Sequence, residues 1–111
     1  VVFTAETRPA FGNPLGTLHG GITATLLDSA MTCAVMSALP AGVAATTLDL
    51  SVRYLRPAPL DGTRIWAVGD LVHRGRTVAT AEGRLVDERD RLIATATTTC
   101  LVVGGNKEGI R

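Results

Sequence analysis

The order of apolar and polar positions changes its period once along the chain. From about Gly21 to Leu39 helix-forming residues dominate, and Pro40 and Gly42 end the run. Apolar side chains in this segment fall on nearly every face of a helix: Ile22, Leu26, Leu27, Ala30, Met31, Ala34, Val35 and Ala38. A helix without a wide polar stripe is typical of an enclosed position. The pattern therefore predicts one long central helix.

Beyond this helix the apolar positions alternate with a period of two. In residues 46–55, one side of the expected strand carries Leu48, Leu50, Val52 and Tyr54. The other side carries Thr47, Asp49, Ser51 and Arg53. This alternation predicts a strand. Three more strands are expected at 63–73, 77–87 and 92–103, with connections short enough for hairpins. Residues 9–17 should form a loop, and the tail from Gly104 should fray.

One apolar helix followed by an antiparallel meander predicts an α+β fold in which a sheet wraps around the helix. At 111 residues the chain fits a single domain, 1–111, although the start at Val1 without a Met suggests that amino-terminal residues are missing. Four or five strands cannot cover the whole helix and also their own outer face. We therefore expect a dimer that joins two sheets.

Composition and charge exclude several classes of function. A net charge of +1 without a basic run gives no reason to expect a nucleic-acid partner. Residues 20–39 contain an acid and several hydroxyl groups, so no membrane span is expected. The two histidines and two cysteines lack metal-ligand spacing, so neither a metal nor another cofactor is expected. Cys33 and Cys100 are interpreted as reduced thiols in the cytoplasm, with a disulfide as the alternative.

A single ionisable carboxylate, Asp28, interrupts the predicted helix. Such a residue can point to solvent or cap a backbone group, but an enclosed helix makes either arrangement difficult. Burying an unpaired carboxylate costs several kcal/mol unless its pKa rises or a partner satisfies it. A carboxylate of raised basicity suits a general base or a nucleophile, which makes Asp28 a candidate catalytic group.

The residues His19-Gly20-Gly21 stand at the start of the same helix. Free backbone N–H groups and the positive end of the helix dipole meet there, and glycine lets a substrate oxygen approach closely. Such an end can hold the oxyanion that develops when a carbonyl is attacked. Asp28 lies about two turns away, roughly 11 Å along the axis, which is too far for both groups to act on one atom. A dimer would bring Gly20 of one chain near Asp28 of the other.

The pattern Asn13-x5-His19-Gly20-Gly21-x6-Asp28, followed by a small-residue helix and the strand Thr47-Leu-Asp-Leu-Ser-Val-Arg-Tyr-Leu-Arg-Pro, resembles the hotdog-fold acyl-CoA thioesterases. The similarity is greatest to the branch of the phenylacetate-pathway and 4-hydroxybenzoyl-CoA thioesterases. It extends from about Phe11 to Val103. The segment that usually precedes the motif in this family is absent. The resemblance implies a hotdog fold that hydrolyses an acyl-CoA thioester, in a dimer with shared sites and as a dimer of dimers.

The resemblance also implies a role for each matching residue. Asp28 would be the nucleophile or the general base on water, and the Gly20 N–H would polarise the thioester carbonyl. Asn13 occupies the place of an amide near the carbonyl or the water, and His19 would orient the loop as a hydrogen-bonding group. Thr47 and Thr32 match hydroxyl positions that help to place the water, although threonine is equally ordinary in strands and small-residue helices.

Four arginines are candidates for the coenzyme A end of the substrate: Arg53, Arg56, Arg74 and Arg76. The second pair flanks Gly75 in a predicted hairpin turn, where two guanidinium groups can grip phosphates. The alternative is a solvated hairpin tip.

Two other functions compete with thioester hydrolysis. A non-catalytic acyl-CoA sensor on the same fold should lack the acid on the helix, and a hotdog hydratase should carry a D-x4-H-type segment, which does not occur here. Acyl-carrier-protein thioesters remain possible substrates. The acyl group itself is not predicted, although its pocket is expected to include Phe11, Leu15, Met31 and Val35.

Overall fold

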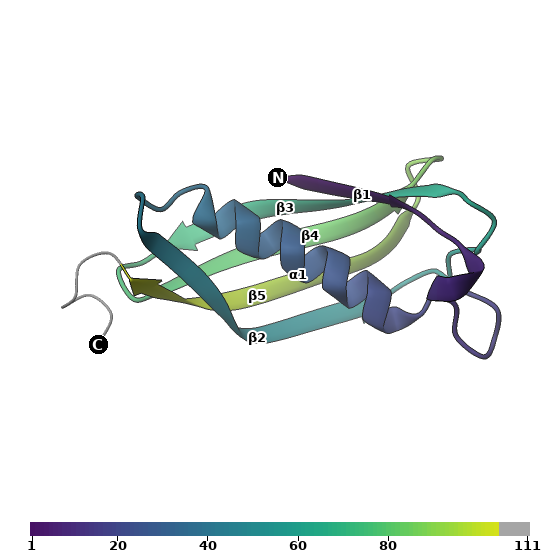
Figure 1. Ribbon diagram of the computed structural model, residues 1–111, viewed down its shortest axis with the longest axis horizontal. Helices are drawn as coiled ribbons and strands as arrows, with labels where there is room; N and C mark the ends of the chain where they lie inside the picture. The colour runs from purple at the N-terminus through teal and green to yellow at the C-terminus, as the bar shows by residue number, and fades with distance from the viewer. Residues whose placement is uncertain (105–111) are drawn as a thin grey trace.

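The computed structural model describes residues 1–104 as one long helix lying across a five-stranded antiparallel sheet (Figure 1). The elements in chain order are β1 (Val2–Glu6), the 3-10 turn η1 (Pro9–Phe11), α1 (Gly20–Met36), β2 (Val43–Tyr54), β3 (Arg64–Arg74), β4 (Val78–Asp87) and β5 (Leu92–Gly104). The strands are ordered β1-β3-β4-β5-β2, and every neighbouring pair is antiparallel. The predicted α+β layout is confirmed.

The predicted helix and strands are all found, although α1 ends at Met36 and not Leu39, and β2 begins at Val43 and not Thr46. Larger differences lie at the two ends of the chain. The pattern gave no strand before residue 9, whereas β1 pairs with β3 along all five of its residues. At the other end, Gly104 is the last residue of β5, and the rest of the tail that was expected to fray lies outside the described residues.

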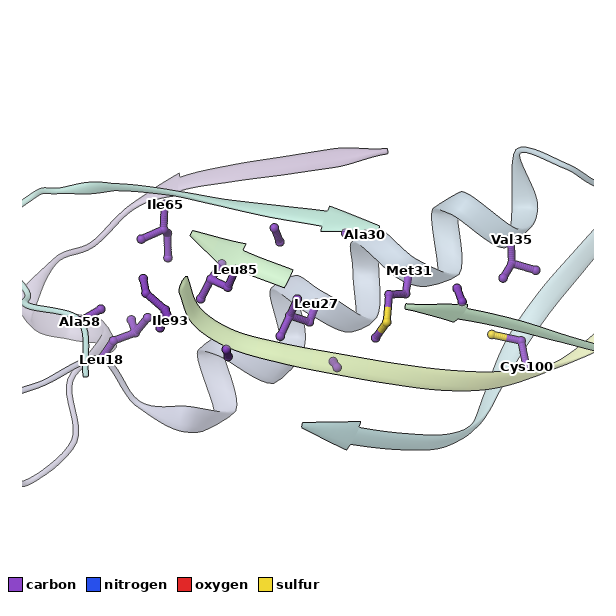
Figure 2. Packing of buried hydrophobic residues seen from close by; sticks show 14 of the residues in the cluster. Leu18, Leu27, Ala30, Met31, Val35, Ala58, Ile65, Leu85, Ile93 and Cys100 are labelled. Atoms are coloured by element: carbon purple, nitrogen blue, oxygen red, sulfur yellow. The ribbon is translucent and has the colours of Figure 1, made fainter. Parts of the chain in front are cut away.

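The core lies between α1 and the sheet (Figure 2). One face of the helix is buried, through Thr23, Leu27, Ala30, Met31, Ala34 and Val35. The opposite face, which includes Asp28, Thr32 and Cys33, is only half-buried. The prediction of a helix enclosed on every side is therefore wrong for the single chain, because five strands cover only one face of it. The remaining apolar surface of α1 is available to another subunit.

Two glycines opposite each other in β3 and β4 set how deeply the helix sits. Gly69 pairs with Gly83, and a Cβ on Gly69 would overlap the backbone of Ala30. A Cβ on Gly83 would lie 3.0 Å from Met31 Cγ. Side chains at these positions would lift α1 from the sheet. The pair thus places the middle of the helix, one turn from Asp28, directly on the strands.

A β-bulge interrupts the alternation of β2. The pairing with β5 shifts between Thr47, opposite Cys100, and Asp49, opposite Thr99. Leu48 is the extra residue and is 58% exposed, so its predicted place beside Leu50 is wrong. The bulge reverses the alternation at this point, which turns Thr47 toward the helix together with Leu50.

The predicted β4–β5 hairpin is confirmed, and a buried acid holds its turn. Asp87 Oδ1 accepts hydrogen bonds from the N–H groups of Arg89 and Arg91, and Oδ2 accepts one from Arg91 Nε, each at 2.9 Å. Burial raises the pKa of Asp87, but these bonds and the Arg91 charge outweigh it, so the pKa lies below its ordinary value. The hairpin is thereby fixed at the end of the sheet away from the β3–β4 turn.

Cys33 and Cys100 are both free thiols, as predicted. No helix within residues 1–104 has the length and apolar character needed to cross a bilayer. Over the same residues, no three His, Cys, Asp or Glu side chains gather closely enough to hold a metal ion.

Candidate active site

Asp28 projects from the half-buried face of α1 toward β2. Its Oδ1 accepts a hydrogen bond from Thr47 Oγ1 at 2.7 Å and another from Thr32 Oγ1 at 3.3 Å. The two hydroxyl oxygens lie 3.2 Å apart. The expectation of an unpaired acid in an apolar pocket is therefore wrong, because the bulge in β2 brings a hydroxyl donor to it. The other carboxylate oxygen, Oδ2, has no hydrogen-bond partner within residues 1–104.

A cavity of about 340 Å³ opens beside this carboxylate. Its lining residues are Phe3, Asp28, Ser29, Thr32, Cys33, Ala45, Thr46 and Thr47. Phe3 comes from β1, a strand that the sequence pattern did not predict. Ser29 and Cys33 were not identified either, since neither differs in type from its helical neighbours. The free oxygen of Asp28 can thus meet a substrate or a water molecule from this cavity.

The first turn of α1 uses all but one of its backbone donors. His19 is the N-cap: its Nδ1 accepts from the Gly21 N–H at 2.8 Å, so the neutral ring carries its proton on Nε2. The His19 carbonyl accepts from Ile22 and Thr23 at 3.0 and 3.3 Å. The Gly20 N–H has no acceptor among the described residues. One donor therefore remains free at the positive end of the helix dipole.

The free Gly20 N–H borders a second cavity, of about 490 Å³. Its lining residues are Asn13, Thr17, Leu18, Gly20, Gly21, Thr23, Tyr54, Leu55, Arg56, Pro57, Ala58 and Ile93. Tyr54 and Thr17 were not identified from the sequence as site residues. Tyr54 follows the apolar alternation of β2, which identifies a core position as readily as a site.

Asn13 shapes the loop that forms one wall of this cavity. Its Oδ1 accepts from the backbone N–H groups of Leu15 and Thr17 at 3.0 and 3.1 Å, and its Nδ2 donates to Thr17 Oγ1 at 3.0 Å. One proton of Nδ2 remains to contact a substrate. Asn13 thus stabilises the loop that leads into α1, and His19 stabilises the first turn of the helix.

The predicted catalytic residues divide into two groups within one chain. Asn13, His19 and Gly20 gather at the start of α1, whereas Asp28, Thr32 and Thr47 gather at its middle. The cavities beside the two groups share no lining residue. A single chain thus carries two candidate half-sites, one at the start of α1 and one at its middle.

The four candidate arginines do not converge in one chain. Arg56 lines the Gly20 cavity, but Arg53 lies on the opposite face of the sheet beside Asp70, Glu82 and Arg84. Arg74 and Arg76 are exposed at the β3–β4 turn, at the other end of the sheet from Arg56 (Figure 1). Gly75 is required in that turn, since its N–H donates to Val78 O at 2.8 Å and a Cβ would lie 2.5 Å from that oxygen.

Two of the expected acyl-pocket residues are misplaced. Met31 and Val35 point into the core and expose none of their surface, so they cannot line an open pocket (Figure 2). Phe11 is half-buried, and Leu15 stands 88% exposed on the loop that Asn13 holds. The misplacement follows from the uniformly apolar helix, whose sequence does not show which face meets the sheet.

Residues 15–94 match the model of a known family, the thioesterase superfamily. The chain belongs to the thioesterase superfamily. Acyl-coenzyme A thioesterase 13 of Mus musculus is 38% identical over 76 residues, which cover 68% of this chain and 53% of that protein. Thioesterase-superfamily membership confirms the resemblance read from the motif around Asp28.

Solved structures support the hotdog fold of this thioesterase-superfamily chain. A Bacillus halodurans protein determined with CoA has a TM-score of 0.87 and 35% identity, covering 95% of this chain and 68% of that one. A phenylacetic acid degradation-related protein of Ralstonia eutropha JMP134 has a TM-score of 0.82 and 34% identity, covering 90% and 74%. The chain spans little more than half the length of the curated relatives it matches, between 53% and 57%.

Proposed function

We propose that the protein hydrolyses an acyl-CoA thioester to a carboxylic acid and free coenzyme A. The observation that carries this proposal is the pair of half-sites on α1. One presents a carboxylate with a free oxygen, and the other presents the single unpaired N–H of the helix start. Membership in the thioesterase superfamily supports the choice of a thioester, and the mouse relative is an acyl-coenzyme A thioesterase.

Asp28 would act in one of two ways. As a general base, it takes a proton from a water molecule whose oxygen attacks the thioester carbon. As a nucleophile, it attacks that carbon itself to form a mixed anhydride, which water then hydrolyses. In both cases the carbonyl oxygen becomes an oxyanion that the Gly20 N–H stabilises, and the C–S bond breaks to release the coenzyme A thiol. Thr47 and Thr32 hold Oδ1, so Oδ2 faces the reacting atoms.

The two groups would meet across a dimer. Placing the exposed faces of two α1 helices side by side in opposite directions brings the Gly20 end of each chain toward Asp28 of its partner. The edge strand β2 has no neighbour on its outer side within the described residues, so it can continue the sheet into a second copy. We extend the proposal to a dimer of dimers in the cytoplasm, where the free thiols of Cys33 and Cys100 would stay reduced.

Mixing two inactive variants tests the shared site. Asp28→Asn removes the carboxylate, and Gly20→Pro removes the N–H, so each homodimer has two defective sites. A mixed dimer has one site with both groups intact and one with neither. Random re-pairing should therefore restore about one quarter of the wild-type kcat, measured as thiol release from an acyl-CoA. Activity no higher than the sum of the separate variants would show that each site belongs to one chain.

Coenzyme A would bind through exposed arginines. Arg74 and Arg76 make no ion pair with any described residue, so their charge is available to phosphates. Arg56 beside Gly20 is the second candidate, whereas Arg53 faces away from both half-sites. The Bacillus halodurans structure, which was determined with CoA, supports a coenzyme A ligand.

The double variant Arg74→Ala/Arg76→Ala should raise KM for acyl-CoA about tenfold and leave kcat nearly unchanged, because phosphate contacts are equal in ground and transition states. The loss should shrink with added salt, since exposed charges are screened over about 8 to 10 Å. An N-acetylcysteamine thioester, which lacks the nucleotide, is the matched substrate and should be hydrolysed equally by both proteins. An unchanged KM for acyl-CoA would identify the turn as a solvated tip and direct attention to Arg56.

A further inference from the structure

Tyr54, the last residue of β2, lies against the start of α1. Its phenol oxygen donates to the Gly20 carbonyl oxygen at 2.7 Å. The ring also packs on Gly20, since a Cβ at that position would lie 3.1 Å from Tyr54 Cζ. Yet 56% of Tyr54 is exposed, and the side chain lines the same cavity as the free Gly20 N–H. Its contacts are therefore those of a site residue, not of a core residue.

The Tyr54 hydroxyl donates to the carbonyl of the peptide unit that joins Gly20 to Gly21. The N–H of the same unit belongs to Gly21 and donates to His19 Nδ1. Hydrogen bonds on opposite edges thus hold this peptide in one plane. The Gly20 carbonyl also accepts the helical hydrogen bond from the Ala24 N–H, so Tyr54 supplies its second bond. Two consecutive glycines have no Cβ to restrict their φ and ψ, so losing the Tyr54 bond lets the first turn sample more orientations.

The free N–H of Gly20 belongs to the preceding peptide unit. The carbonyl of that unit is held by the N–H groups of Ile22 and Thr23. The angle between the two units depends only on the φ and ψ of Gly20, and Tyr54 helps to fix the unit on one side of it. The direction of the free N–H relative to the cavity therefore depends on the Tyr54 hydroxyl together with the bonds of the helix start.

We propose that Tyr54 is a positioning residue whose hydroxyl locks the Gly20–Gly21 peptide and so aims the Gly20 N–H at the developing oxyanion. This inference rests on the proposed function, in which that N–H stabilises the transition state. A donor that is held in place before the reaction needs no reorganisation when charge develops. The Tyr54 bond joins two parts of the enzyme and does not contact the substrate. Its loss should weaken oxyanion stabilisation, which lowers kcat, and leave KM nearly unchanged.

Tyr54→Phe removes the hydroxyl and keeps the ring that lines the cavity. We expect kcat for acyl-CoA hydrolysis to fall about five- to tenfold, the loss typical of one neutral hydrogen bond, with little change in KM or Tm. The amide resonances of Gly20 and Gly21 should shift in an NMR spectrum, while those of Asp28 and Thr47 should stay in place. A wild-type kcat, or a raised KM with unchanged kcat, would contradict the positioning role and show that Tyr54 only lines the cavity.

A double-mutant cycle with Gly20→Pro tests the proposed mechanism, with Gly20→Ala as a second background, because its Cβ meets the Tyr54 ring in the same way while the N–H is kept. Once the N–H is absent, the Tyr54 hydroxyl has no donor to position. Tyr54→Phe should therefore cause no further loss of kcat in that background. If Tyr54→Phe lowers kcat by the same factor in both backgrounds, the positioning role is wrong. If Gly20→Pro alone keeps full kcat, the assignment of Gly20 in the proposed function fails instead. The two failures are therefore distinguishable.

Discussion

Asp28→Asn should lower kcat for thioester hydrolysis about a hundredfold or more, because an amide can neither accept the proton of water nor attack the thioester carbon. The fold should survive the change. Asparagine has the same shape as aspartate, and its Oδ1 can still accept from Thr47 and Thr32. Thiol release from an acyl-CoA, with Tm measured on the same samples, checks both expectations.

Asp49→Asn is the matched control for this substitution. Asp49 lies two residues from Thr47 in β2, is exposed, and has no side-chain hydrogen bond within residues 1–104. The control makes the same change of charge and should leave kcat at the wild-type value. Near-full turnover by a folded Asp28→Asn protein would remove Asp28 from the chemistry. Acyl-CoA binding without thiol release by the wild-type protein would instead favour the non-catalytic, acyl-CoA-binding alternative.

Gly20→Pro should lower kcat by about 10²- to 10³-fold, the loss typical of one oxyanion donor. Proline has no N–H, and the first position of a helix tolerates it well. The residue before it, His19, already has φ −64° and ψ 133°, which is the extended conformation that a following proline requires. The substitution therefore deletes the one free donor while α1 stays intact.

Gly20→Ala is the matched control, since it keeps the N–H but adds a Cβ against the Tyr54 ring. Tyr54 is partly exposed and can move aside, so the alanine variant should lose no more kcat than Tyr54→Phe does. Steady-state kinetics of both variants separate the loss of the donor from crowding. Equal kcat values for the proline and alanine variants would contradict an oxyanion role for the Gly20 N–H.

The bulge at Leu48 shows where the sequence pattern was insufficient for the site. Strict alternation puts Thr47 on the side away from Leu50, whereas the family resemblance assigns it to the site, as a hydroxyl group that helps to place the water. The structure resolves this conflict, since one extra residue in β2 changes the face of Thr47 and leaves Leu48 exposed. A bulge depends on pairing with a partner strand, and the pattern of one strand does not contain it.

For the uniformly apolar helix, the sequence left open which face is buried. Its composition predicted its existence and length well, but it gave no polar stripe from which to choose the buried face. Met31 and Val35 were therefore expected in an acyl pocket, although both lie in the core, with Met31 against Gly83. The glycine pair in β3 and β4 sets how closely the Ala30–Met31 segment of that face approaches the sheet.

The sequence alone determined the helix, four of the five strands, and the two parts of the candidate site, because each is encoded in local periodicity or in a contiguous motif. Tertiary structure decided which groups meet: Thr47 with Asp28, Tyr54 with Gly20, and β1 with β3. These contacts join residues far apart in the chain. They depend on strand register and on how close the helix packs to the sheet, and neither quantity is recorded in a local pattern.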